Sequence, residues 1–97
     1  MPALWKIDRD YIYDPEIDGR WGGKTAAGRV RSRSWDKYPE RQKDATMRFR
    51  MLDDDGNIYY GGRCTPDTEF EPLWDFGMPN AGAVTIQFKE NGKWVTL

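Results

Sequence analysis

The pair Asn91-Gly92 lies at the centre of the most regular part of the chain and constrains how that part folds. Residues 84 to 89 alternate apolar and polar side chains, which is the period of a half-buried β-strand. Asn-Gly is the preferred pair for a two-residue type I′ turn, so we predict a hairpin. Its predicted pairs are Glu90 with Lys93, Lys89 with Trp94, Phe88 with Val95, Gln87 with Thr96, and Ile86 with Leu97. This register places the apolar pairs and Val84 on one face. Trp94 lies on the other, where it is covered by another segment, stacked under Lys89 or offered to a partner.

A second hairpin is predicted between residues 46 and 64. Apolar residues alternate with arginines from 47 to 51, and the run 53–56, three aspartates and a glycine, supplies a turn. A loop of two or four residues places this apolar face opposite Ile58 and Tyr60. It also gathers Arg48, Arg50 and Tyr59 on the other face. A three-residue loop with a bulge instead exchanges Tyr59 and Tyr60 between the faces.

Two further segments carry weaker signals. Apolar residues between 4 and 13 indicate one strand with a bend or bulge at residues 8–10. Residues 70–82 indicate a helical turn and loop, in which Gly77 is a C-terminal cap and Pro79 blocks continuation. We expect Leu73, Trp74 and Phe76 to close one end of the core.

Residues 14–45 lose this periodicity and are rich in glycine, serine and charge. A loop of this length is uncommon in a compact domain and is often functional or mobile. We predict a mobile basic loop over 14–45, with a short strand at 27–30 and a helical turn at 38–44. The chain is expected to form a single domain, 1–97. The predicted fold is mainly β, a small antiparallel barrel or curled meander of four to six strands with one short helical turn.

Composition narrows the functional classes. The 97 residues allow one hydrophobic core, and no apolar run is long enough to span a membrane. The N-terminus lacks the pattern of a signal peptide, and Cys64 is the only cysteine, so we expect a cytoplasmic protein without an internal disulfide. The chain has no histidine, which removes the usual general base and zinc ligand. We therefore expect no enzyme, no metal site and no cofactor.

Charge is distributed unevenly along the sequence. Residues 20–50 hold ten basic and three acidic residues, a net charge of +7, whereas the whole chain has a net charge of −1. Within this stretch Arg29, Arg31 and Arg33 precede Trp35. Such a segment fits an acidic protein surface, where arginines steer and a tryptophan anchors.

We predict a non-catalytic binding protein, a monomer or weak homodimer, that engages an acidic protein partner. The predicted binding residues are Arg29, Arg31, Arg33, Trp35, Arg48, Arg50 and Tyr59. Nucleic acid is the alternative partner for the same residues, through phosphate contacts and base stacking, although the pI of about 5.4 argues against it. Pairing of these arginines with the chain's own carboxylates, and self-association through the last strand or Trp94, stay open.

Three short motifs resemble known sites but lack required parts. Gly22-Gly23-Lys24-Thr25 resembles the end of a phosphate-binding P-loop, but position 18 is not glycine. The acidic run 53–56 resembles a calcium loop without its last glutamate, so we expect a solvated turn. Asp75-Phe76-Gly77 matches a kinase tripeptide by letters only.

A broader pattern begins at Phe49. It comprises Phe49-Arg50-Met51-Leu52-Asp53-Asp54-Asp55-Gly56, Tyr59-Tyr60-Gly61-Gly62-Arg63, Phe70-Glu71-Pro72-Leu73, Asp75-Phe76-Gly77-Met78-Pro79-Asn80-Ala81-Gly82 and Gly92-Lys93-Trp94. The pattern resembles a group of small uncharacterised bacterial proteins encoded by accessory genes of plasmids or phages. Trp74 and Ala83 depart from it. The resemblance implies a binding protein of a mobile element and carries no activity.

Overall fold

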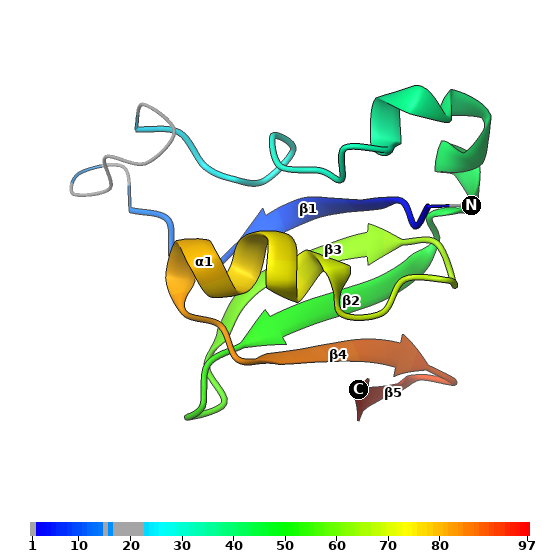
Figure 1. Ribbon diagram of the computed structural model, residues 1–97. Helices are drawn as coiled ribbons and strands as arrows, with labels where there is room; N and C mark the ends of the chain where they lie inside the picture. The colour runs from blue at the N-terminus through cyan, green and yellow to red at the C-terminus, as the bar shows by residue number, and fades with distance from the viewer. Residues whose placement is uncertain (1, 15, 17–22) are drawn as a thin grey trace.

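The fold is built on one open antiparallel sheet (Figure 1). The computed structural model describes residues 2–14, 16 and 23–97. Its five strands have the spatial order β1-β3-β2-β4-β5. They are β1 (Trp5–Asp10), β2 (Met47–Leu52), β3 (Ile58–Cys64), β4 (Thr85–Glu90) and β5 (Lys93–Thr96). Within the described residues β1 and β5 form the two edges, so the sheet does not close into a barrel. The predicted mainly antiparallel β fold is confirmed, in its curled, open form.

The C-terminal hairpin has the predicted register. β4 and β5 pair Glu90 with Lys93, Lys89 with Trp94, Phe88 with Val95, and Gln87 with Thr96. Asn91 and Gly92 have φ values of 52° and 79°, as a type I′ turn requires. Val84 was wrongly predicted to be buried. It precedes β4 and is 50% exposed, and its amide donates to the carbonyl of Leu52 at the end of the sheet.

The hairpin of β2 and β3 places Phe49, Met51 and Tyr60 on one buried face. A bulge follows Met51, so Leu52 pairs with Ile58 and Tyr59 is the extra residue. The prediction that Ile58 shares the buried face with Tyr60 is therefore wrong, because the bulge moves Ile58 to the opposite face, beside Arg9 and Arg50. Opposite Phe49 lies Gly62. A Cβ there would collide with the carbonyl oxygen of Lys6 and would lie 2.7 Å from the Phe49 ring, so only glycine fits.

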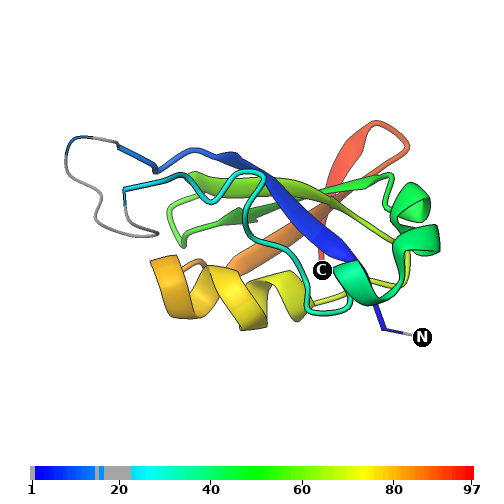
Figure 2. The ribbon, with the colours of Figure 1, turned by 90° about the horizontal axis from the view of Figure 1, so that it is seen from above.

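A helical segment covers the buried face of the sheet, below it in Figure 2. It contains η4, a π-helical turn (Leu73–Gly77), followed by α1 (Met78–Ala81). The prediction that this segment ends at Gly77 is wrong. Gly77 has helical φ and ψ and lies against Met51, where a Cβ would come within 2.6 Å of the sulfur atom. Pro79 occupies the first turn of α1, where its missing N–H is tolerated. Gly82 caps the helix instead, with a φ of 73°.

The main core lies between the sheet and this helical segment. Its largest members are Trp5, Ile7, Phe49, Met51, Tyr60, Leu73, Phe76, Ile86 and Phe88. The prediction that Trp74 belongs to the core is wrong, because Leu73, Phe76 and Gly77 form the buried side of this turn. Trp74 is 61% exposed and stacks on Phe70.

Residues 23–45 pass along the outside of β1 and then cross one end of the sheet (Figure 1). Next to β1, Arg31 lies opposite Lys6, whereas the strand expected at 27–30 is a turn around Gly28. The helical turn predicted at 38–44 is confirmed as η3 (Pro39–Asp44), which follows η2 (Trp35–Lys37). The rest of the predicted 14–45 loop, residues 15 and 17–22, lies outside the described residues.

Candidate anion-binding face

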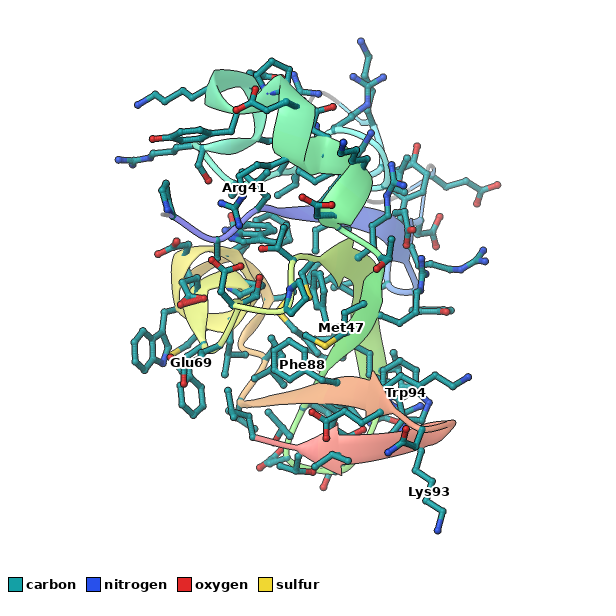
Figure 3. The ribbon with its side chains drawn as sticks, turned by 90° about the vertical axis from the view of Figure 1, so that its right-hand side faces the viewer. Arg41, Met47, Glu69, Phe88, Lys93 and Trp94 are labelled. Atoms are coloured by element: carbon teal, nitrogen blue, oxygen red, sulfur yellow. The ribbon has the colours of Figure 1, made fainter. Side chains whose placement is uncertain are left out.

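The second face of the sheet carries no helix along most of its length (Figure 2). Alternation along the strands directs six basic residues to this side: Lys6, Arg9, Arg48, Arg50, Arg63 and Lys89. Trp94 points to the same side, away from Phe88 and the core (Figure 3). Among the described strand residues Asp8 is the one carboxylate on it. We call this surface the basic face.

A bulge in β1 shapes one side of the basic face. The register shifts between Ile7 and Arg9, so that Ile7 lies opposite Gly62 and Arg9 opposite Gly61. Asp8 is the additional residue and turns its carboxylate to the basic face. There it accepts two hydrogen bonds from Arg48, of 2.8 and 3.0 Å. Arg48 is therefore neutralised within the fold, whereas Arg9 has no carboxylate partner among the described residues.

Arg50 is held by contacts from two neighbouring strands. Its Nε donates to Oε1 of Gln87 at 2.7 Å, and Gln87 in turn donates to the hydroxyl of Thr96 at 3.0 Å. The Arg50 guanidinium carbon lies 4.2 Å from the ring centroid of Trp94. Neither terminal nitrogen of Arg50 has a partner among the described residues. This geometry fixes the plane of the guanidinium and leaves its two terminal nitrogens, with four N–H groups, for a carboxylate or phosphate.

A groove of about 190 Å³ lies beside Arg50, over Gly61. Its walls include Arg9 and Tyr11 from the β1 side and Arg50 and Trp94 from the other. Because Gly61 has no side chain, the groove reaches down to the sheet between the arginines. Tyr11 is 58% exposed and presents an uncovered aromatic ring at its margin.

Trp35 closes the opposite end of the basic face. It belongs to a small second cluster with Leu4, Ala45 and Tyr38, and it is only 4% exposed. The cations of Lys6 and Arg63 each lie 5.8 Å from its ring centroid. Trp35 thus supports two of the basic residues and does not itself protrude as an anchor.

The seven residues predicted from the sequence are divided by the fold. Arg48 and Arg50 lie on the basic face, whereas Tyr59 is the bulge residue of β3 and packs against the main core. Arg29 is exposed in the turn beside β1, while Arg31 pairs with Asp36 at 3.0 Å. Arg33 lines a different groove, next to the helical segment. The seven predicted residues therefore do not lie on one surface of the described structure.

Four residues of the basic face were missed by sequence reasoning: Lys6, Arg9, Arg63 and Lys89. Each of them is next to a strand residue that faces the core. The alternation of side chains along a strand could therefore have predicted that these four point to the opposite face. It was overlooked because these residues lie in regions of net negative charge, outside the basic stretch.

The carboxylates gather elsewhere. Asp67, Glu69, Glu71 and Asp75 lie in and before the helical segment, and Figure 3 shows Glu69 on the side opposite Trp94. The pKa of Asp67 is lowered, because hydrogen bonds from Thr65 and the nearby Arg41 outweigh the effect of burial, which raises it. The small net charge of the chain thus hides an uneven distribution of charge, with six basic residues on one face of the sheet and these four carboxylates on the other side.

The short motifs do not form additional sites in the described residues. The carboxylates of 53–55 lie within 4.8 Å of one another. The carboxylate of Asp53, however, stabilises the turn, because it accepts hydrogen bonds from the amides of Asp55 and Asn57. The hydrogen bond from the Asn57 side chain is the main reason that the pKa of Asp53 is lowered. Thr25 and Ala26 donate to Asp10, and Gly22 of the P-loop-like run lies outside the described residues. Cys64 is buried, which raises its pKa to about 12.

No protein-family model matches the chain, and comparisons with curated proteins and with solved structures give no match. None of the helices in the described part of the chain is both long and apolar enough to cross a membrane.

Proposed function

We propose that this chain is a non-catalytic binding module whose basic face docks an anionic macromolecule. The observation that supports it most directly is Arg50, held by Gln87 and Trp94, whose two terminal nitrogens have no partner in the described part of the chain and can meet a ligand. A cation fixed before binding loses little side-chain freedom on binding, which favours affinity. Arg9, Arg63 and Lys89 add positive charge within the same face.

Of the two partner classes expected from the sequence, single-stranded nucleic acid fits this face better. Proteins that bind single strands combine a basic groove with aromatic rings on an open sheet. Here the groove over Gly61 lies between Arg9 and Arg50, with Tyr11 at its margin. The low pI argues less strongly against this partner, since four of the acidic residues, Asp67, Glu69, Glu71 and Asp75, lie in and before the helical segment, away from the basic face.

An acidic protein surface is the second candidate, because a carboxylate can accept both terminal N–H groups of Arg50 in a bidentate pair. In this form the partner contacts the basic face, and Trp35 contributes by supporting Lys6 and Arg63 from within the fold.

Fluorescence anisotropy with a labelled twelve-nucleotide oligo(dT) tests the proposal. Each phosphate neutralised on a single strand contributes about −0.7 to the slope of log K against log salt. We expect a slope of about −2 to −4 and a reduction in its magnitude of about 1.4 for Arg9→Gln/Arg50→Gln. Lys24→Gln/Lys43→Gln changes the net charge equally away from the basic face and should leave the slope unchanged.

A labelled polyglutamate peptide is measured alongside the oligonucleotide. Binding of the peptide alone identifies the second candidate. If neither probe binds at low salt, or if both double variants weaken binding equally, the basic face is not the docking surface.

A further inference from the structure

A second groove, separate from the basic face, lies between the segment flanking β1 and the helical segment. It consists of two adjoining hollows of about 590 and 330 Å³. The two share Trp5, Ser32, Arg33 and Asp75, so they form one continuous groove. Ligand sites are commonly about 300–1,000 Å³, and this groove has that size. None of its lining residues takes part in the groove over Gly61.

The walls of this groove carry opposite charges that do not neutralise each other. Arg33 and Lys37 lie on one wall, and Glu71 and Asp75 lie on the other. Within the described chain no ion pair or side-chain hydrogen bond engages Arg33, Lys37 or Asp75. A ligand that carries both a carboxylate and a cation satisfies both walls at once.

The main chain of Arg31 provides a second, independent feature. The amide of Ile7 donates to Val30, and the amide of Ser32 donates to Trp5, so the Lys6–Arg31 pair is of the type without direct hydrogen bonds. The N–H and C=O of Arg31 therefore point away from β1, and neither has a partner among the described residues. They form the outer edge of the sheet at the groove, where an extended peptide can add as a strand.

The floor of the groove is apolar and aromatic. Trp5 lines both hollows, Phe76 and Val30 line the smaller one, and Tyr38 borders the larger. Trp5 is only 3% exposed, and no described residue accepts a hydrogen bond from its indole N–H. The floor thus offers a surface for aliphatic side chains and one further donor.

We propose that this groove binds an extended peptide segment in which acidic and basic side chains alternate. Successive side chains of an extended peptide point to opposite sides, so the acidic ones meet Arg33 and Lys37 while the basic ones meet Glu71 and Asp75. Its main chain pairs with Arg31. A free amino acid satisfies the charges but cannot fill the groove or pair along the edge, which favours a peptide.

The probe is the capped peptide acetyl-Val-Asp-Lys-Asp-Lys-Val-amide, added to the isotope-labelled protein during NMR titration. We expect saturable shifts of the Arg31 amide and the Trp5 indole N–H, and none at Arg50. Arg33→Gln/Asp75→Asn keeps the net charge and should weaken binding about tenfold or more, since charged hydrogen bonds are lost on both walls. The matched control Arg29→Gln/Asp54→Asn should bind as the wild type does.

Three results would each overturn this proposal. The first is the absence of shifts at Arg31 and Trp5 at millimolar peptide. The second is equal binding by the peptide with Asn and Gln in place of its charged residues. The third is that a mixture of free aspartate and lysine reproduces the shifts. Because these signals do not involve the basic face, the outcome is independent of the oligonucleotide experiment.

Discussion

The guanidinium group of Arg50 lies over the ring of Trp94, with its central carbon 4.2 Å from the ring centroid. This contact joins β2 to the edge strand β5. Cation–π contacts at partly exposed sites contribute about 0.5–1 kcal/mol. The same arginine donates to Gln87 of β4, so one side chain connects three strands. The contact therefore serves both the stability of the sheet and the orientation of the proposed docking group.

Replacing Arg50 by lysine should separate charge from geometry. Lysine keeps the positive charge but has no Nε–H for Gln87 and no planar group to stack on Trp94. We expect the free energy of unfolding to fall by about 1 kcal/mol and oligonucleotide binding to weaken. Urea denaturation and anisotropy measure the two effects. Arg29→Lys, in an exposed turn, is the control, and equal behaviour of the two variants would contradict the role given to Arg50.

Two adjacent glycines should lose unequal amounts of stability when replaced by alanine. At Gly62 the new Cβ collides with the Lys6 carbonyl and the Phe49 ring, so we expect a loss of about 3 kcal/mol. At Gly61 the nearest atom is 3.5 Å away, an ordinary contact, so the loss should stay below about 1 kcal/mol. Chemical denaturation of both variants tests this. A mildly destabilised Gly62→Ala would mean that β1 and β3 can separate more easily than the packing indicates.

Trp35 and Trp74 should contribute unequally to stability. Trp35 is 4% exposed and Trp74 is 61% exposed. Trp35→Leu should cost about 2–4 kcal/mol, whereas Trp74→Leu should stay within about 0.5 kcal/mol. Thermal and urea unfolding distinguish them. Comparable losses would show that the second cluster does not hold the end of the sheet.

Cys64 should be unreactive in the folded protein. Burial is the main cause of its raised pKa, about 12, so at neutral pH the side chain is a protonated thiol. A chromogenic disulfide reagent should label it slowly in native buffer and rapidly in urea. Rapid labelling of the native protein at neutral pH would contradict this environment.

Asp53 should make the free energy of unfolding depend on pH in the acidic range. Its folded pKa lies below the ordinary value of 3.8, chiefly through the hydrogen bond from Asn57, so its contribution is present above about pH 4 and is lost as pH falls through the folded pKa. Asp53→Asn should remove that part of the dependence, while Asp54→Asn should retain it. Urea unfolding between about pH 7 and pH 2.5 compares them. Parallel curves for the wild type and Asp53→Asn would exclude the effect.

Local features of the sequence were sufficient to predict that the chain forms these two hairpins. The register of β4 and β5 follows from Asn91-Gly92 because a two-residue turn with positive φ leaves no alternative pairing that keeps the apolar face intact. Alternation also predicts that Phe49, Met51 and Tyr60 share the buried face of β2 and β3, but not the bulge that moves Ile58 to the other face. The helical turn at 38–44 was also predictable. Each of these depends on residues close together in the chain.

The candidate site depended on contacts between distant segments. Lys6, Arg63 and Arg48 belong to three strands, and they share one face only because β3 lies between β1 and β2 and because Asp8 forms a bulge. Side-chain alternation shows which residues of a strand share a face, but not which strands are neighbours or which face is covered. Packing of the whole chain decided that Trp35 is buried, that Trp74 is exposed, and that the basic central stretch is divided between two grooves.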